Sequence, residues 1–327
     1  MKFKILEFLK KQNDFVSSEE IKKVFNISLE DISKNILKLK NLGYDILSQP
    51  DKGYLFKNSF NDTMNDYEIK TSLKTKSFAK DFLFLEEVDS TNNEAKVQAQ
   101  NGVCDGFLVI SEKQTKGKGR LGNSWIHSQN ENLAFSLVLK PTILPNEIMP
   151  LTLITGIAIC KALRKLEIPA FLKWPNDIVI NGKKAVGILT ELSCEAEKIN
   201  FLIVGIGINV NTKVFDESIE HKATSLFLET QKNFNRLQVL NAILVEFENI
   251  YFEFLKSGSF KPFVKEYKSI CLNIGKKINA TSKQKTITGT ATGISENGEL
   301  IVKNNENDTV SILSGEVSVR LENGNYI

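Results

Sequence analysis

The spacing of apolar residues changes character twice along this chain. Residues 1–57 place apolar side chains first at helical intervals and then in two short alternating runs. Between about residues 80 and 270, apolar runs of strand length mix with long helical segments. From Gly275 onward, short alternating runs are separated by Gly and Asn. These changes of pattern predict three structural units that follow one another along the chain.

The first unit has the order helix, helix, turn, helix and hairpin. Its expected helices and strands cover residues 1–12, 19–25, 28–42, 44–49 and 54–57. Gly43 stands where a left-handed helix C-cap belongs, and Pro50-Asp51-Lys52-Gly53 forms the hairpin turn. This order is typical of a winged helix-turn-helix. The polar residues 58–66, with an unpatterned segment up to Lys80, predict a linker.

The residue pattern of the central unit predicts a mixed sheet with helices on one face. Its expected elements are strands at 107–111 and 133–140, a helix at 148–166, four strand-like runs that end at Val210, and helices at about 236–256 and 260–271. Strands and helices do not alternate strictly, so a doubly wound parallel sheet is not expected. The short runs after Gly275 predict a small β-barrel of SH3-like size.

Composition narrows the classes of function. The chain has 327 residues, of which 42% are hydrophobic and 25% charged, and this excludes disorder, collagen and a small disulfide scaffold. A net charge of +3 gives no field for coating nucleic acid or an anionic membrane, so any nucleic-acid role must be local. The four cysteines are far apart and there are two histidines, so neither a zinc site nor a disulfide framework is expected.

Two apolar segments bear on localisation. Residues 1–12 alternate lysines with apolar side chains, which predicts an amphipathic helix and not the core of a signal peptide. The apolar window 151–160 is about half the length of a membrane span. We therefore expect a soluble cytoplasmic protein without a membrane partner.

A glycine-rich loop at residues 116–122, KGKGRLG, interleaves three cations with glycines. It matches G-x-G-x-x-G, but turn residues and a strand follow where a dinucleotide site needs a helix. The loop is suited to closing around a phosphate through backbone N–H groups and basic side chains, although a solvated hairpin loop explains it about equally well. Arg120 is one of only four arginines in the chain, which favours a geometric role for its guanidinium group.

Three more motifs stand out in the sequence, and each has an explanation in terms of local structure. DSTNNE at 89–94 matches a capping box with Thr91 at N-cap and Glu94 at N3. KWPND at 173–177 separates two strand-like runs with a turn. GIGINVN at 205–211 places glycines inside an apolar strand, which costs stability unless a ligand or another backbone comes close.

Together and in this order, these motifs resemble the biotin protein ligases, specifically the bifunctional BirA type that is also the biotin operon repressor. The segments that carry the resemblance are DSTNNEA at 89–95, KGKGRLGNSW at 116–125, KWPNDI at 173–178, KKAVGILTEL at 183–192, VGIGINVN at 204–211 and GEVSVR at 315–320. The resemblance covers nearly the whole chain. It implies an α+β multidomain fold, with a winged helix-turn-helix DNA-binding domain at 1–62, a class II aminoacyl-tRNA synthetase-like mixed α/β catalytic domain at 80–272 and an SH3-like C-terminal β-barrel at 273–327.

The resemblance also implies the reaction. Such a ligase joins biotin and ATP into biotinyl-5′-AMP and transfers the biotinyl group to a lysine of the biotin carboxyl carrier protein of a biotin-dependent carboxylase. ATP enters with Mg²⁺, no resident metal is expected, and biotin, as the adenylate, serves as corepressor. Expected partners are the carrier protein, operator DNA and a second copy of the chain when the adenylate is bound.

The resemblance assigns roles to named residues. Lys184, which would bridge the biotin carboxylate and the α-phosphate, and Arg120 are the catalytic candidates. The biotin-binding candidates are Ser90, Thr91, Asn92, Gln114, Lys118, Gly119, Arg120, Lys184 and Gly187. The candidates for ATP and adenylate binding are Gly117, Lys118, Arg120, Asn176, Asn209, Glu316 and Arg320. Lys118 stands where the family more often has arginine, which loses a bidentate fork. Trp125 and Trp174 are candidates for apolar walls or for ordinary core packing.

The winged helix has its own candidate residues. The second helix of the helix-turn-helix, residues 28–42, would enter the major groove. The DNA-binding candidates are therefore Ser28, Lys34, Asn35, Lys38 and the wing residue Lys52. Glu30 and Asp31 at the start of that helix favour the helix dipole and oppose phosphate binding. A winged helix that no longer binds DNA is therefore the alternative to a repressor.

Three other functions compete with the ligase. A lipoate protein ligase shares the fold and the adenylate chemistry, but its acid lacks a ureido ring, so the polar residues 90–92 and Gln114 favour biotin. A transcription factor that only senses a small molecule has no need of phosphate-binding cations such as Lys184 and Arg320. A pseudo-enzyme is the third alternative.

Overall fold

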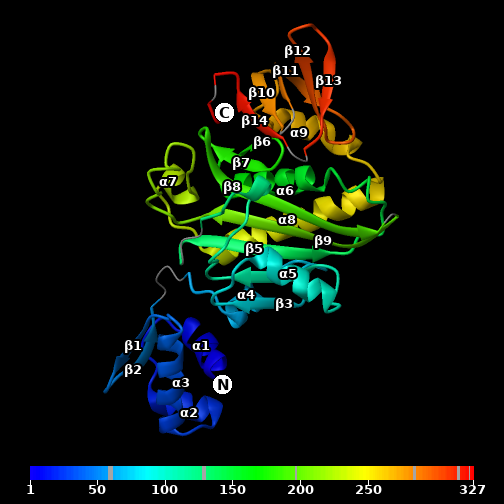
Figure 1. Ribbon diagram of the computed structural model, residues 1–327. Coiled ribbons are helices and arrows are strands. Elements are labelled where there is room, and N and C mark those ends of the chain that lie inside the picture. The colour runs from blue at the N-terminus through cyan, green and yellow to red at the C-terminus, as the bar shows by residue number, and fades with distance from the viewer. Residues whose placement is uncertain (58–61, 127–129, 196, 283–284, 315–316, 324) are drawn as a thin grey trace. The chain divides into compact units, whose positions relative to one another are not determined.

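The computed structural model describes residues 1–57, 62–126, 130–195, 197–282, 285–314, 317–323 and 325–327. The chain divides into two units, Met1–Ser72 and Leu73–Ile327 (Figure 1). In the described residues, no helix combines the length and apolar character that crossing a bilayer requires.

The N-terminal unit confirms the predicted order of elements. Its helices are α1 (Lys2–Lys10), α2 (Ser18–Phe25) and α3 (Leu29–Asn41), and its antiparallel hairpin is β1 (Ile46–Gln49) with β2 (Gly53–Phe56). Ser17 and Ser28 are the N-caps of α2 and α3, and their hydroxyls accept hydrogen bonds from the N–H groups of Glu20 and Asp31. The core is apolar side chains from all three helices and the hairpin, among them Leu6, Ile32 and Phe56.

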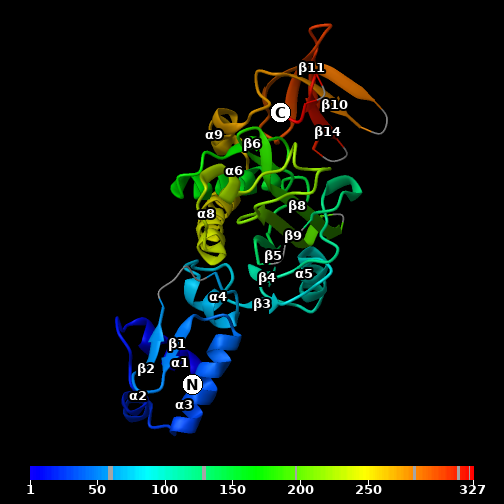
Figure 2. The same cartoon turned by 90° about the vertical axis from the view of Figure 1, so that its left-hand side faces the viewer.

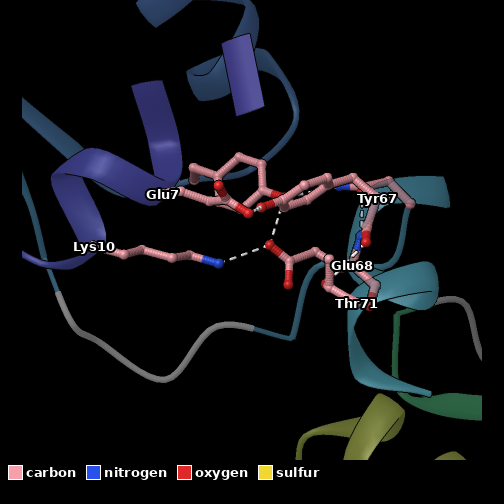
Figure 3. A network of polar contacts seen from close by, with 7 residues as sticks. Glu7, Lys10, Tyr67, Glu68 and Thr71 are labelled. Atoms are coloured by element: carbon pink, nitrogen blue, oxygen red, sulfur yellow. Dashed lines mark hydrogen bonds and ion pairs between the residues drawn. The ribbon is translucent and has the colours of Figure 1, made fainter. Parts of the chain in front are cut away.

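A fourth helix, α4 (Asp66–Ser72), lies where the sequence predicts a linker. It packs against α1, and Figure 3 shows Tyr67 and Glu68 facing Glu7 and Lys10. The Tyr67 ring is stacked on Phe3 at a centroid distance of 4.1 Å. The Tyr67 hydroxyl donates to Glu7 at 2.6 Å, and Glu68 accepts hydrogen bonds from Lys10 Nζ and the Tyr44 hydroxyl, each at 2.8 Å. The unit therefore continues to Ser72, beyond the boundary expected at residue 62.

A seven-stranded sheet forms the centre of the second unit, in the order β3-β4-β5-β9-β8-β7-β6. The strands are β3 (Phe82–Leu85), β4 (Phe107–Ser111), β5 (Asn132–Leu139), β6 (Phe171–Lys173), β7 (Asp177–Ile180), β8 (Lys183–Glu195) and β9 (Lys198–Asn209). Only the β3–β4 pairing in this sheet is parallel, which confirms the predicted mixed sheet. The short edge strand β3 is not among the predicted strands.

The expectation of helices on one face is wrong. The helices are α5 (Thr91–Gln100), α6 (Leu151–Lys165), α7 (Leu226–Thr230), α8 (Arg236–Ser257) and α9 (Val264–Ile270), with 3-10 turns η1 (Arg120–Gly122) and η2 (Lys261–Phe263). Helices α6 and α8 lie on one side of the sheet and α5 on the other (Figure 2). All eight residues of β5 are buried, because this strand is covered on both faces.

Alternation along the strands separates the two faces. Val138 and Ile203 pack against Ala95 and Ala99 of α5. Gly156 of α6 faces side chains of the opposite set, including Ile188. The surface toward α5, called here the α5 face, carries the candidate site.

The C-terminal part of this unit is a five-stranded antiparallel sheet in the order β13-β12-β11-β10-β14. Its strands are β10 (Lys277–Thr281), β11 (Thr286–Ile294), β12 (Leu300–Asn304), β13 (Thr309–Ile312) and β14 (Ser318–Leu321). Trp174, fully buried, joins it to the central sheet, because its Nε1 donates to the Gly298 carbonyl at 3.2 Å. Trp174 is therefore packed in the core, and it also belongs to the lining of the large hollow described below.

Candidate functional site

Three strand glycines leave the backbone bare on the α5 face. Gly187 of β8 pairs with Gly207 of β9, and Gly205 lies two residues before it. A Cβ at Gly205 would stand 1.9 Å from Asn92 Oδ1, and one at Gly207 would stand 2.5 Å from the Trp125 indole. Any larger residue at these two positions would displace the side chains that close over the strands.

Four predicted residues gather at the N-terminus of α5. Gln114 Oε1 accepts hydrogen bonds from the Thr91 N–H at 2.8 Å and from the Thr91 hydroxyl at 3.1 Å. The Ser136 hydroxyl lies 2.8 Å from Thr91 Oγ1 and donates to Asn92 Oδ1 at 2.6 Å. Ser90, Thr91 and Asn92 are all buried, so these polar groups form a desolvated set that offers both donors and acceptors.

The predicted capping box is wrong by one residue. The helix begins at Thr91, and its N-cap is Ser90, whose side chain makes no capping hydrogen bond. Thr91 is not free to cap because its hydroxyl is already bonded to Gln114 and Ser136. The pattern therefore marks the site rather than the helix start.

Ser136 and Glu191 belong to this network although neither is among the predicted residues. Glu191 accepts hydrogen bonds from Asn92 Nδ2 at 2.7 Å and from Lys96 Nζ at 2.5 Å, and so fixes the orientation of the Asn92 amide. A signal for Ser136 exists in the sequence, since it is the one hydroxyl inside the apolar run Leu133–Leu139. Glu191 lies within the motif KKAVGILTEL without a distinguishing feature of its own.

Lys184 is held by a buried carboxylate. Its Nζ lies 2.5 Å from Asp177 Oδ1, across the β7–β8 pair, and Lys173 Nζ lies 3.9 Å from Asp177 Oδ2. Burial acts to raise the pKa of Asp177, but Lys184 and Lys173 outweigh it, so the pKa is below its usual value and the carboxylate is ionised. Burial lowers the pKa of Lys173 to about 8, against the attraction of Asp177.

The glycine-rich loop brings Arg120 to the same place. Its guanidinium group donates to Asn176 Oδ1 at 3.2 Å and to the backbone carbonyls of Ser314 and Val317. Burial lowers the pKa of Arg120, and Asp177 opposes this shift. Lys118, by contrast, is exposed, and its Nζ donates to Asn93 Oδ1 at 2.5 Å.

Two hollows meet at these residues. The small hollow, of about 50 Å³, is lined by all the predicted biotin-binding residues: Ser90, Thr91, Asn92, Gln114, Lys118, Gly119, Arg120, Lys184 and Gly187. The large hollow, of about 520 Å³, is lined by Arg120, Asn176, Asn209 and Arg320 from the predicted nucleotide set, and by Lys173, Asp177, Lys184 and Tyr326. Both hollows share Gly119, Arg120, Trp125, Asn176 and Lys184.

Two predicted nucleotide residues do not join the large hollow. Gly117 packs against the backbone of Trp125, where a Cβ would stand 2.4 Å from its carbonyl oxygen. Lys118 lines the small hollow but not the large one. Glu316 lies outside the described residues.

Trp125 covers part of the small hollow. Its ring lies over Gly187 and Gly207, with Lys184 Nζ at 5.5 Å from a ring centroid. Among the described residues, nothing accepts a hydrogen bond from its Nε1. Of the two tryptophans singled out in the sequence, Trp125 lies over the strand glycines, whereas Trp174 is buried in the core and lines the large hollow.

The predicted DNA-binding residues lie on α3 and the hairpin of the first unit. Ser28 caps α3, Lys34 forms an ion pair with Glu30 at 2.7 Å, and Asn35 Nδ2 donates to the Asp31 carbonyl at 2.7 Å. Lys38 and the wing residue Lys52 are exposed. Three of the five candidates are therefore already engaged within α3.

Comparison with known proteins follows the order of the units. Residues 2–55 match an HTH domain, residues 84–209 the Biotin/lipoate A/B protein ligase family, and residues 274–320 the Biotin protein ligase C terminal domain. The chain is 34% identical over 298 residues to the Bifunctional ligase/repressor BirA of Bacillus subtilis, covering 90% of this chain and 91% of that protein. The chain belongs to the bifunctional biotin protein ligases.

Other members of the family span a similar length or share the solved fold. The Bifunctional ligase/repressor BirA of Escherichia coli is 27% identical over 310 residues, 94% of each chain. The biotin protein ligase from Aquifex aeolicus in complex with biotin and ATP is 37% identical and superposes with a TM-score of 0.66, covering 74% of this chain and all of that one.

The described residues hold no group of three or more His, Cys, Asp or Glu side chains placed to bind a metal ion.

Proposed function

We propose that this biotin protein ligase activates biotin with ATP to biotinyl-5′-AMP, transfers the biotinyl group to a lysine of the biotin carboxyl carrier protein, and represses the biotin operon. The observation that carries the catalytic half is the junction of the two hollows. A desolvated donor and acceptor set lines one, cations line the other, and Lys184 and Arg120 belong to both.

Each hollow suits one reactant. Biotin's ureido ring has two N–H donors and a carbonyl acceptor, which the Thr91, Asn92, Gln114 and Ser136 groups complement. Mg²⁺·ATP enters the large hollow as a substrate complex, where Lys173, Arg120 and Arg320 offer positive charge to its phosphates. The biotin carboxylate and the α-phosphate then approach each other at the shared wall.

Lys184 acts at this junction. Two anions must come within bonding distance, and the charge that develops on the α-phosphate oxygens must be stabilised as pyrophosphate leaves. The Lys184 ammonium group, fixed by Asp177, supplies that charge, while Arg120 holds the loop across the intermediate. In the second step the carrier's lysine amine attacks the acyl carbon and AMP leaves, so no protein nucleophile is needed.

The site favours biotin ligation over the alternatives. A lipoyl chain has no ureido ring, so it offers no polar groups to match the buried donors and acceptors around Asn92 and Ser136. A sensor of biotin alone has no use for the cations of the large hollow, which sit around Asp177. The same arrangement argues against a pseudo-enzyme.

The repressor half rests on the winged helix and on family membership. With the adenylate as corepressor, α3 would read the operator, and a second copy of the chain would join through the central sheet. A cytoplasmic location fits these partners. Within the same proposal, the seven-stranded core is class II aminoacyl-tRNA synthetase-like and the C-terminal five-stranded sheet is SH3-like.

Adenylate formation tests the catalytic half. Purified protein, labelled ATP and Mg²⁺ are incubated with biotin, with lipoate or with no acid, and a carrier domain is then added. We expect a label that depends on biotin and a biotinyl group that moves to the carrier. Formation of an adenylate with lipoate alone, or with neither acid, would contradict the proposal.

A gel shift tests the repressor half. The probe is DNA from upstream of the protein's own biotin operon, with biotinyl-5′-AMP present or absent. We expect retardation that increases with the adenylate and decreases with salt. No retardation at low salt would leave the winged helix without a DNA-binding role.

A further inference from the structure

The last residues of the chain return to the large hollow. After β14 the Leu321 N–H donates to the Asn325 carbonyl at 3.1 Å, and the Asn325 N–H donates to Asn323 Oδ1 at 3.0 Å. Tyr326, the next residue, lies in the lining of the large hollow. The sequence motifs and the family match both end at Arg320, so neither assigns a role to this tyrosine.

Tyr326 contacts the carboxylate that holds Lys184. Its hydroxyl donates to Asp177 Oδ2 at 2.5 Å, while the other oxygen, Oδ1, lies 2.5 Å from Lys184 Nζ. The pKa of the Tyr326 hydroxyl is well above its usual value because of burial and the nearby carboxylate, so the group stays a donor. Each oxygen of Asp177 thus has its own close partner.

The tyrosine ring is held from outside by two cations. Lys173 Nζ lies 4.1 Å from the ring centroid, and the Arg320 guanidinium carbon lies 5.3 Å from it. Both distances are within the range of cation–π attraction. The ring therefore has a fixed place, and the direction of its hydroxyl is determined by that place.

Tyr326 forms a wall of the large hollow and does not fill it. About 520 Å³ remain open with the ring in position, which is within the usual range for a small-molecule site. A side chain that blocked the nucleotide would leave little of this volume. The geometry is that of a residue that acts on its neighbours while the nucleotide is bound.

We propose that Tyr326 is a positioning residue for adenylate formation, which acts by holding the Asp177 carboxylate in the orientation that places Lys184 at the junction of the two hollows. This rests on the proposed ligase function. Without the hydroxyl, Oδ2 keeps only longer contacts such as Lys173 Nζ at 3.9 Å, so the carboxylate is less constrained and can share its charge between two lysines. Lys184 then loses its fixed position.

The test compares Tyr326→Phe, which keeps the ring and removes only the hydroxyl, with Tyr54→Phe, a hydroxyl deletion on the hairpin of the other unit. Biotin-dependent exchange of pyrophosphate into ATP is measured on full-length protein. For Y326F we expect kcat to fall by about tenfold to a hundredfold, since small misplacements of a catalytic group cost on this scale. The KM values for ATP and biotin and the melting temperature should stay those of Y54F.

A second variant, ending at Asn325, removes the ring as well and should lose at least as much kcat as Y326F. A rise in activity or a lower KM for ATP in this variant would instead identify the tail as an obstruction and overturn the proposal. A Y326F protein with unchanged kcat, or with only a raised KM for ATP, would do the same.

A crystal structure of Y326F gives a readout that does not depend on activity. We expect Lys184 Nζ to have left Asp177 Oδ1. An unmoved ion pair overturns the positioning role whether or not the wild-type protein forms an adenylate. A wild-type protein without exchange activity contradicts the proposed function only.

Discussion

Lys184 combines two properties that a single residue rarely has. It belongs to the lining of both hollows, and its ammonium group is fixed by an ionised, buried carboxylate. Its neighbour Lys183 points elsewhere and donates to the Glu220 carbonyl at 2.9 Å. The two adjacent lysines therefore form a natural pair for comparison.

We expect Lys184→Met to lower the rate of adenylate formation by about 10²- to 10³-fold, because a preorganised charge at the reacting phosphate is lost. Lys183→Met, which changes the same net charge one residue away, should keep nearly the full rate. Biotin-dependent pyrophosphate exchange measures both. Equal losses in the two variants would mean that net charge, and not position, is what matters.

We expect Lys173 to make nucleotide capture sensitive to pH. Its pKa of about 8 means that the side chain is charged at lower pH and becomes neutral as the pH rises through this value. Since kcat/KM reports the ionisation of the free enzyme, kcat/KM for ATP should decline above about pH 8. In Lys173→Arg the decline should move to higher pH, and an unchanged profile in that variant would assign it to another group.

Glu30 forms an ion pair with Lys34 on α3, the helix that would read DNA in the proposed repressor. Glu30→Gln releases Lys34 and removes a charge that repels phosphate, so we expect roughly two- to fivefold tighter operator binding at low salt. The control is Glu19→Gln, which loosens a similar exposed pair with Lys22 on α2. A gel shift with adenylate present decides between them, and equal tightening would indicate a nonspecific charge effect.

At the scale of elements, helix α4 shows how a short helix is stabilised by what it packs on. Seven residues are too few for a stable isolated helix, so α4 depends on Ile69, which is fully buried, and on the polar contacts of Tyr67 and Glu68 with α1. Its sequence, DYEIKTS, has no periodic pattern, and this explains why sequence reasoning predicts a linker there.

Loss of the Tyr67 ring should open α4 locally. In Tyr67→Ala the stacking on Phe3 disappears, and we expect the free energy of local opening of α4 to fall by about 1–3 kcal/mol. Tyr67→Phe keeps the stack and loses only the hydrogen bond to Glu7, so its effect should be smaller. Hydrogen exchange of the α4 amides in the full protein measures both, and similar values would make the hydroxyl the main contact.

The elements that were predicted and those that were missed differ in where their signal lies. The helices α2, α3, α6 and α8 and the strands β7–β9 carry local periodicity and caps, so the sequence predicts them. β3 has only the four residues FLFL, and the coverage of both sheet faces depends on how distant segments pack. The run Leu133–Leu139, apolar apart from Ser136, did contain that second signal, since a strand buried on both faces does not alternate.

The whole molecule determines which residues meet. The sequence motifs predict the residues of both hollows because each motif is recognisable by itself, and the family resemblance supplies their roles. Asp177, Ser136, Glu191 and Tyr326 take part through contacts between segments as far apart as 149 positions, as in the Tyr326–Asp177 bond. No local pattern encodes such a pairing, so the structure was needed to bring these residues together, although Ser136 has a signal of its own in the apolar run of β5.

Ligand binding should tighten the second unit as a whole. The large hollow is lined by the central sheet and by β14 of the C-terminal sheet, so an occupant contacts both. With biotin and Mg²⁺·ATP at 100 times their dissociation constants, the stabilisation is about 2.7 kcal/mol for each site. We expect slower hydrogen exchange in β7–β9 and in β10–β14 together, and protection limited to one sheet would contradict a common site.

Trp125 belongs to the walls of both hollows and lies on the strand glycines that biotin would approach. A ligand that shifts this side chain on entering one hollow changes the wall of the other, and this would couple the two binding equilibria thermodynamically. Such coupling is reciprocal. If bound biotin raises the affinity for nucleotide by some factor, bound nucleotide raises the affinity for biotin by the same factor. Where that factor exceeds one, bound biotin increases the fraction of the protein that binds ATP. The amount of ATP held by the protein would then rise with the concentration of biotin.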